Sequence, residues 1–375
     1  MMRSYDVAVI GLGAMGSAAA FHLARRGMSV IGFDRFSPPH SLGSSHGETR
    51  IIREAYFEDP RYVPMVQRSA VLWEELERAS GTRLFFRTGG LMIGLEDGTL
   101  VRGARASAET HRLPCEVLGA RALRERYPAF RPREDEVGVW EPRAGVLFPD
   151  SCVAAHLESA RAAGAELRTD EPVIAWRASG EGFEIETARG RFAAGALVLA
   201  AGAWIPSLAH GLALPLEVTR QPIFWFEPKA HPERFDPERF PIYIWEHEPG
   251  RYFYGFPAFE GRIKVATHME GAPADPDSLD REVTEQEVAV LRARLRDYLP
   301  DAEGRFHSAA VCMYASTPDG HFAIDRHPDH PRAIVLSACS GHGFKFAPAI
   351  GEIAADLVEG RAPATPLELF RLRWR

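Results

Sequence analysis

The chain contains few cysteines, and their spacing excludes two kinds of structure. Only four occur in 375 residues, Cys115, Cys152, Cys312 and Cys339, and no two form a C-x-x-C pair. This argues against a disulfide framework and against a cysteine-rich zinc site. The 14 histidines include no H-x-x-x-H pair, so we expect no metal. Such cysteine usage fits a reducing compartment, and we predict a cytoplasmic protein.

The chain also lacks long apolar runs and a strong charge of either sign. No stretch reaches the length of a transmembrane helix, and we expect no signal peptide, because the first apolar stretch is the predicted strand itself. A formal net charge of −7 indicates neither nucleic acid nor a membrane as partner. A hydrophobic content of 46% is typical of globular proteins, and the length favours two domains.

Residues 5–34, YDVAVIGLGAMGSAAAFHLARRGMSVIGFD, carry the clearest motif. A short strand leads into Gly11, Gly13 and Gly16, and a second strand ends at Asp34. These glycines permit a tight turn, a close approach to a pyrophosphate and close helix packing, while the helix start favours phosphates. The Asp34 carboxylate suits a ribose 2′-OH and disfavours NADP. The segment predicts a site for NAD or FAD, with a structural βα turn as the alternative.

Another apolar strand, later in the chain, runs directly into small residues at ALVLAAGAW, residues 196–204. Alone, it fits an ordinary buried strand and turn equally well. Small residues there would let the backbone pass beside a bound nucleotide, as in many two-domain flavoproteins. Together with the first motif, the segment favours FAD over NAD.

Helix and strand signals indicate two interleaved domains. Caps and apolar spacing predict helices at residues 60–81, 150–164, 284–300 and 346–358. Short strands separated by turns predict an antiparallel sheet within residues 216–314, and residues 228–240 read as a surface loop. We predict a nucleotide domain built from residues 1–85, 150–215 and 315–375, and a substrate domain built from residues 86–149 and 216–314.

Two segments carry cations suited to ligand binding. In HSLGSSHGETRIIR, residues 40–53, small polar residues can turn donors toward a pyrophosphate or flavin, and a helix would place Arg50 and Arg53 on one face. In RIKVATH, residues 262–268, strand alternation places Lys264 opposite its apolar neighbours. Solvated arginines and a solvent-facing lysine are the structural alternatives.

Two further segments combine small or apolar residues with reactive groups. AVCMY, residues 310–314, surrounds Cys312 with apolar side chains, which on its own is typical of an inert buried cysteine. SGHGFKF, residues 340–346, joins a strand to a helix through two glycines. Glycine loses more conformational entropy on folding than other residues, so two glycines here favour a backbone that approaches a ligand over a simple strand-to-helix connection.

Taken together, the segments resemble monomeric sarcosine oxidase, N-methyltryptophan oxidase and pipecolate oxidase, of the glycine/D-amino-acid oxidase superfamily. The resemblance rests on GLGAMGSAAA, SPPHSLGSSHGETRIIR, GVLFP, ALVLAAGAW, YGFP, AVCMY with TPDGHFAID, and SGHGFKF, in the family's order from residue 7 to 346. It implies an α/β fold in which a Rossmann-like FAD-binding domain is interleaved with an antiparallel-sheet substrate domain. It also implies a monomer that oxidises a secondary amino acid through hydride transfer to covalent FAD and reduces O2 to H2O2.

The resemblance further implies roles for individual residues. Cys312 would carry FAD through its sulfur, and Lys264 would lie near flavin N5 and promote reaction with oxygen. Arg53 and Lys345 would bind the substrate carboxylate. The other residues implied to line the substrate pocket are His268, Tyr254 and Tyr314, and those implied to lie near the flavin ring are Arg50, His46 and His342. The remaining residues expected to bind the cofactor, by motif or by resemblance, are Gly11, Gly13, Ala14, Met15, Gly16, Asp34, Ser44, Val173, Ala201, Gly202, Trp204, Met313, Gly341, Gly343 and Phe344, together with Lys345.

The segment YIWE, residues 243–246, departs from what a strict sarcosine enzyme would carry. We expect Trp245 either to shrink the substrate pocket or to stack on a larger substituent. The substrate therefore stays open among sarcosine, other N-methyl amino acids, proline and pipecolate. The alternatives in function are a flavin dehydrogenase that passes electrons to a quinone or a protein, and a non-catalytic dinucleotide-binding protein.

Overall fold

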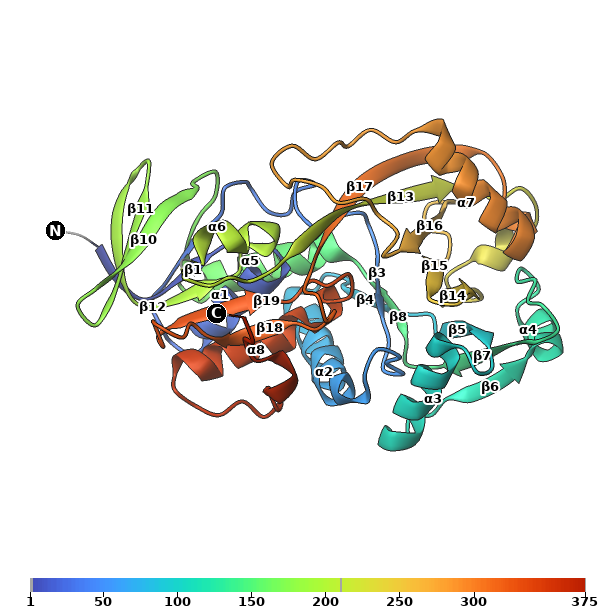
Figure 1. The fold of residues 1–375 in the computed structure, drawn as a ribbon, viewed down its shortest axis with the longest axis horizontal. Coiled ribbons are helices and arrows are strands. Elements are labelled where there is room, and N and C mark those ends of the chain that lie inside the picture. The colour runs from blue at the N-terminus through green and yellow to red at the C-terminus, as the bar shows by residue number, and fades with distance from the viewer. Residues whose placement is uncertain (1–2, 210, 375) are drawn as a thin grey trace.

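Two large β-sheets at opposite ends of an elongated molecule are joined by a small sheet between them (Figure 1). The computed structural model describes residues 3–209 and 211–374. The small sheet consists of β3 (Arg50–Ile52), β8 (Gly145–Leu147) and β4 (Phe85–Arg87). The predicted α/β class is confirmed, while the domain boundaries stay a prediction.

The first large sheet carries the N-terminal glycine motif. Its strand order is β10-β11-β12-β1-β2-β9, and β19 continues it from β12 to β18. The strands are β1 (Arg3–Ile10), β2 (Val30–Phe33), β9 (Glu166–Arg168), β10 (Val173–Ser179), β11 (Gly182–Thr187), β12 (Gly190–Leu199), β18 (Ala323–Arg326) and β19 (Ala333–Ser337). Because β9, β2, β1, β12 and β19 run parallel, their carboxyl ends share one edge, where such sheets bind ligands.

Both faces of this sheet are buried, as alternation along β1 demonstrates. Val7 and Val9 pack into one apolar cluster with the helices, and Ala8 and Ile10 pack into another on the opposite face. The helices that pack around α1 (Ala14–Arg25) on the first face are α5 (Pro149–Ala162) and α8 (Ala347–Val358), and α2 (Val63–Ser80) packs against α8 and α5. The short helix α6 (Ile205–Leu208) contributes to the opposite face.

The second large sheet has the order β17-β13-β16-β15-β14-β5-β7-β6. Its strands are β5 (Gly90–Leu95), β6 (Glu116–Gly119), β7 (Glu136–Glu141), β13 (Glu217–Phe226), β14 (Ile242–Glu248), β15 (Arg251–Gly255), β16 (Ile263–His268) and β17 (Phe306–Ser316). The antiparallel sheet predicted within residues 216–314 is confirmed, and a parallel pair, β14 with β5, extends it. Helices α3 (Thr99–His111), α4 (Ala120–Arg126) and α7 (Glu285–Tyr298) belong to this end of the molecule (Figure 1).

Short 3-10 turns refine the predicted helix boundaries. They are η1 (Pro60–Tyr62), η2 (Gly202–Trp204), η3 (Pro232–Phe235), η4 (Pro300–Ala302), η5 (Phe344–Phe346) and η6 (Glu368–Phe370). The helix predicted from residue 60 begins as η1, capped by the Asp59 carboxylate, and continues as α2. The surface loop predicted at residues 228–240 is wrong in part, because Phe235 and Phe240 are buried in the aromatic core of the second sheet.

Two absences concern the described residues only. None of the helices within residues 3–209 and 211–374 combines the length and apolar character that a membrane crossing needs. The same residues contain no group of three His, Cys, Asp or Glu side chains placed to hold a metal ion.

Candidate active site

A cavity of about 350 Å³ lies at the carboxyl ends of β1, β2 and β12. Gly11 has φ +89°, and a Cβ there would lie 2.6 Å from the carbonyl oxygen of Ala200. A Cβ on Gly16 would lie 1.7 Å from the carbonyl oxygen of Gly11, so only glycine lets α1 lie this close to the turn. Asp34 accepts hydrogen bonds from the backbone N–H groups of Leu12 (2.7 Å) and Phe36 (2.9 Å), and burial raises its pKa.

Most residues predicted to bind the cofactor line this first cavity. They are Gly11, Gly13, Ala14, Met15, Asp34, Ser44, Val173, Ala201, Gly202, Trp204 and Phe344. Gly16 is absent from the lining because it lies at the helix–turn contact. His46 is buried but outside the cavity, and its Nε2 has no hydrogen-bond partner among the described residues.

A second cavity of about 100 Å³ adjoins the first, and Ser44, Cys339 and Phe344 line both. It gathers the predicted residues Arg50, Arg53, Tyr254, His268, Cys312, Met313, Tyr314, Gly341, His342, Gly343, Phe344 and Lys345. These come from β3 and the residue that follows it, from β15, β16 and β17, and from the segment before α8, which are distant in sequence. The two cavities are thus neighbours, and their linings draw on residues of both large sheets.

Arg50 and Cys312 lie side by side in the second cavity, next to Ser44, which lines both cavities. The Arg50 guanidinium lies 3.5 Å from the Cys312 sulfur and donates to the carbonyl of Ser44 at 3.0 Å. Arg50 opens β3, so the predicted shared helical face of Arg50 and Arg53 is wrong, although both side chains still line the second cavity.

Arg53 is paired with an acid that the sequence analysis did not single out, Glu58. Its guanidinium donates to both carboxylate oxygens at 2.7 and 2.6 Å, and Arg53 is 2% exposed. Burial alone would raise the pKa of Glu58, but the Arg53 guanidinium outweighs it and lowers that pKa to about 2. The Glu141 carboxylate supports the same loop, because it accepts from the N–H groups of Glu54 (2.7 Å) and Ala55 (2.8 Å), and burial raises its pKa to about 7.

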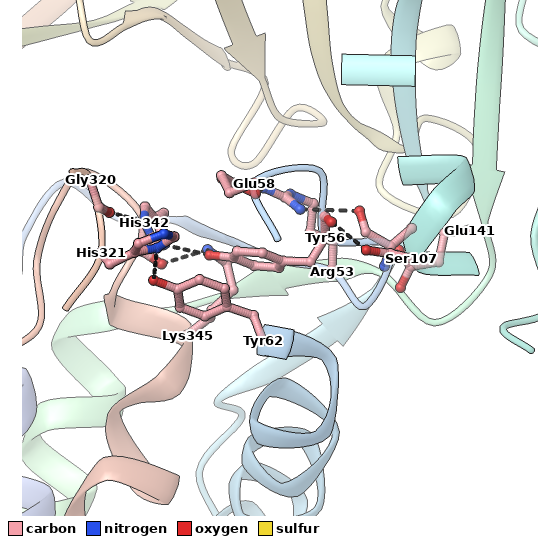
Figure 2. Close-up of polar contacts among 11 residues, drawn as sticks. Arg53, Tyr56, Glu58, Tyr62, Ser107, Glu141, Gly320, His321, His342 and Lys345 are labelled. Atoms are coloured by element: carbon pink, nitrogen blue, oxygen red, sulfur yellow. Dashed lines mark hydrogen bonds and ion pairs between the residues drawn. The ribbon is translucent and has the colours of Figure 1, made fainter. Parts of the chain in front are cut away.

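Lys345 belongs to a buried polar chain with Tyr56 and His342 (Figure 2). Its Nζ donates to the carbonyl of His342 at 2.6 Å and lies 3.5 Å from the Tyr56 hydroxyl. The Tyr56 hydroxyl lies 2.6 Å from His342 Nδ1, and His342 Nε2 lies 3.0 Å from the carbonyl of Gly320. Burial, followed by the charge of Arg53, lowers the pKa of Lys345 to about 7.

His268, Tyr254 and Tyr314 form the aromatic wall of the second cavity. His268 Nδ1 lies 3.2 Å from the Tyr314 hydroxyl, and the ring of Tyr254 stands nearly perpendicular to that of His268. Burial lowers the pKa of His268 to about 4, so the imidazole is neutral at physiological pH.

Lys264 is buried, which excludes the solvent-facing alternative, yet it lies just behind the cavity wall. Its Nζ donates to the carbonyls of Gly47 (2.8 Å) and Thr49 (2.6 Å), and it lies 4.2 Å from the ring centre of Phe256, which lines the second cavity. Burial lowers its pKa well below the ordinary value. Lys264 therefore approaches the site from the side of the Gly47–Thr49 backbone.

The structure corrects the prediction for Trp245. Its side chain is fully buried in the aromatic core of the second sheet, where it stacks on Phe253 and donates to Glu136 at 3.1 Å. The preceding residue, Ile244, lines the second cavity instead. Both faces of β14 are buried, so alternation along this strand offers no polar face that would have revealed which side meets the cavity.

Comparison with known proteins gives one family. The profile of the family described as FAD dependent oxidoreductase (DAO) matches residues 6–357. A monomeric sarcosine oxidase of Streptomyces avermitilis is 45% identical over 375 residues, covering 99% of this chain and 97% of that protein. An N-methyl-L-tryptophan oxidase of Salmonella heidelberg is 36% identical, covering 98% of each. The solved structure of NikD, an unusual amino acid oxidase essential for nikkomycin biosynthesis, has 26% identity and a TM-score of 0.87, covering 99% of this chain and 98% of that one.

Proposed function

Because this chain belongs to the DAO family of FAD-dependent oxidoreductases, we propose that it oxidises secondary amino acids, such as sarcosine and related N-methyl or cyclic amino acids, and reduces O2 to H2O2. The observation that carries this proposal is the second cavity, where two buried basic side chains, Arg53 and Lys345, adjoin the predicted nucleotide site. Paired cations in a dry pocket suit the carboxylate of an amino acid.

The residues of the two cavities fit FAD. Gly11 lines the first cavity and Gly341 the second, both at positive φ. A Cβ at either would collide with the Ala200 carbonyl oxygen (2.6 Å) or the Tyr314 ring (2.7 Å), so glycine gives the tight backbone course at both cavities. The first cavity suits the ADP half, held by the start of α1 and by Asp34, and the second suits the ring. When bound, FAD supplies the electron sink for oxidation of the C–N bond.

We propose that Cys312 attaches the flavin covalently. Cys312 lines the second cavity, and its sulfur lies 3.5 Å from the Arg50 guanidinium. Acid-precipitated wild-type protein should give a yellow pellet, and Cys312→Ala should give a colourless pellet with a yellow supernatant. Cys152 is a buried cysteine outside both cavities, so Cys152→Ala is the matched control and its pellet should stay yellow. A yellow pellet from Cys312→Ala would contradict the attachment.

The chain's own residues bind and orient the substrate. Arg53 and Lys345 hold the carboxylate, while His268, Tyr254 and Tyr314 enclose the amine end. The amine must be neutral before a hydride leaves the adjacent carbon, because an ammonium has no lone pair to stabilise the developing cation. The resulting imine is hydrolysed by water, which for sarcosine gives glycine and formaldehyde.

A peroxide-coupled screen of the purified holoenzyme tests the function. We expect peroxide with at least one of sarcosine, N-methyl-L-amino acids, L-proline and L-pipecolate, and none with glycine, which lacks the N-substituent. Activity confined to primary amino acids, or no turnover with any amine, would contradict the proposal.

We propose that oxygen is the electron acceptor and that the buried Lys264 amine, which donates to the carbonyls of Gly47 and Thr49 behind the cavity wall, stabilises the negative charge that develops on oxygen. Lys264→Met should slow flavin reoxidation in air far more than flavin reduction by substrate. Substrate-dependent reduction of a quinone dye without peroxide would favour a dehydrogenase instead.

A further inference from the structure

Lys345 presents one unused donor position to the second cavity. Of the three positions on its Nζ, one is directed to the carbonyl of His342 and one to the Tyr56 hydroxyl. No other acceptor among the described residues lies within hydrogen-bond distance of Nζ. Because Lys345 lines the cavity and these are its only hydrogen bonds to the described residues, the third position is available to a ligand bound there.

The proton positions in the hydrogen-bonded chain of Lys345, Tyr56 and His342 follow from which of its atoms can only accept. The carbonyl of Gly320 can only accept, so His342 Nε2 carries a proton. Burial lowers the pKa of His342 to about 3, so its Nδ1 has no proton and accepts from the Tyr56 hydroxyl. The Tyr56 oxygen therefore offers a lone pair to Lys345, and Tyr56 and His342 are positioning residues for its amine.

The charged groups around Lys345 do not fix its amine in either the protonated or the neutral form. The cations of the second cavity's lining are Arg50 and Arg53, and the one carboxylate, Glu58, is already engaged by Arg53. His268 and His342 are neutral at physiological pH. Burial and the charge of Arg53 hold the pKa of Lys345 at about 7 against the opposing effect of Glu58. A free amine and an ammonium are thus both accessible near neutral pH.

We propose that Lys345 is the proton acceptor that converts the bound zwitterion into the reactive neutral amine. One proton moves from the substrate nitrogen to the lysine Nζ, no electrons are transferred, and the total charge of the site is unchanged. The lysine becomes the ammonium that pairs with the substrate carboxylate, and the substrate nitrogen gains a lone pair. This inference rests on the proposed function and adds the base that prepares the amine.

Two physical effects favour this transfer. The carboxylate raises the proton affinity of Lys345 when it binds beside Nζ, and removal from water lowers that of the substrate ammonium. The nitrogen and carboxylate of an α-amino acid are joined through a single carbon, so one Nζ at the carboxylate can also reach the amine. Carboxylate recognition and amine activation are therefore coupled in one side chain.

Proton counting by calorimetry tests the inference. Methoxyacetate has the shape of sarcosine but carries an ether oxygen in place of the ammonium, so it brings no proton. In titrations of the holoenzyme at pH 8 in buffers of different ionisation enthalpy, we expect uptake of about one proton per methoxyacetate. Its Kd should rise about tenfold per pH unit above pH 7. Binding without proton uptake and with a flat Kd would overturn the proposal.

Lys345→Arg separates binding from proton transfer, because arginine keeps its charge. Methoxyacetate should bind this variant without proton uptake, and KM for sarcosine should change only a few-fold. Anaerobic flavin reduction by sarcosine should slow at least tenfold at pH 7 and recover as pH rises and the amine loses its proton in solution. Reduction at the wild-type rate at pH 7 would overturn the proposal.

Tyr56→Phe tests the positioning role, and Tyr62→Phe is its matched control. Tyr62 stacks on Tyr56 but its hydroxyl lies 3.1 Å from His321, not at Lys345 (Figure 2). Loss of an acceptor should lower the pH at which proton uptake is half-complete in Tyr56→Phe, with no shift in Tyr62→Phe. An unshifted midpoint in Tyr56→Phe would contradict this positioning role.

Two outcomes separate this inference from the proposed function. If sarcosine reduces the flavin but methoxyacetate binds without proton uptake, only this inference fails. If no amine reduces the flavin, the proposed function fails.

Discussion

Replacing Glu58 with glutamine should make the site bind carboxylates more tightly while it destabilises the fold. Glu58 is the single carboxylate in the second cavity's lining, and it holds the buried Arg53 by two short hydrogen bonds. A ligand carboxylate that binds Arg53 is repelled by Glu58. Glu58→Gln keeps the size of the side chain and removes that repulsion.

The magnitude follows from the pKa of Glu58. A fall from 4.5 to about 2 corresponds to about 3 kcal/mol in favour of the charged form in the folded protein. We expect Glu58→Gln to lower the free energy of unfolding at pH 7 by about 2–3 kcal/mol. A bound ligand recovers part of that interaction, so the Kd of methoxyacetate should fall about tenfold, which is about 1.4 kcal/mol.

Calorimetry at pH 6, where Lys345 is mostly charged, gives the Kd, and urea unfolding gives the stability. Because the folded pKa of Glu58 is depressed, its contribution is present above pH 4.5 and is lost as pH falls toward 2. The difference in stability between wild type and variant should therefore shrink over that range. Glu352→Gln breaks a bidentate pair with Arg68 outside both cavities and should leave the Kd unchanged. An unchanged or higher Kd in folded Glu58→Gln would refute the reasoning.

Three further predictions follow from packing and burial. Ile244→Ala should raise kcat/KM for N-methyl amino acids with larger side chains relative to sarcosine, whereas Trp245→Phe should leave that ratio unchanged and lower the unfolding free energy by about 1–2 kcal/mol. Gly16→Ala, which places Cβ against the Gly11 carbonyl, should cost at least about 2 kcal/mol and lower the flavin content per protein; normal flavin content would contradict the packing argument. Burial of His22 lowers its pKa to about 3, so protonation of the unfolded chain should reduce the free energy of unfolding as pH falls below 6.5, by up to about 1.4 kcal/mol per pH unit. Urea unfolding at a series of pH values should show that the free energy of unfolding of His22→Gln depends less steeply on pH than that of the wild type.

The parts of the fold that the sequence predicts are those where local chemistry and tertiary packing agree. The glycine motif and the helix with the Thr284 capping box lie close to where they were expected. Helices α3 and α4 were missed because each begins after a glycine with no side-chain cap, at Gly98 and Gly119. Their formation depends on contacts with β5, β6 and β7, which a reading of local signals does not contain.

The candidate site was predictable in its residue types but not in its pairings. Motifs identified Arg53 and Lys345, and both line the second cavity. Glu58 was missed because it lies in an irregular loop where no periodic pattern marks it. Its role depends on the folded loop, which brings its carboxylate to the Arg53 guanidinium. Trp245 was misplaced because both faces of β14 are buried and residues 242–245 are apolar or aromatic on both, so alternation does not distinguish the cavity side from the core side.

The charge of the second cavity explains why these pairings matter for function. Its lining contributes three potential cations, Arg50, Arg53 and Lys345, against the single anion Glu58. Buried charge without a partner is costly, so such a site favours an occupant that brings negative charge. Lys345 can relieve the excess by giving up its proton, which Arg50 and Arg53 cannot do at physiological pH. The one adjustable cation is therefore also the group that a zwitterion can protonate, so the same charge excess that recruits the carboxylate prepares the acceptor for the amine's proton.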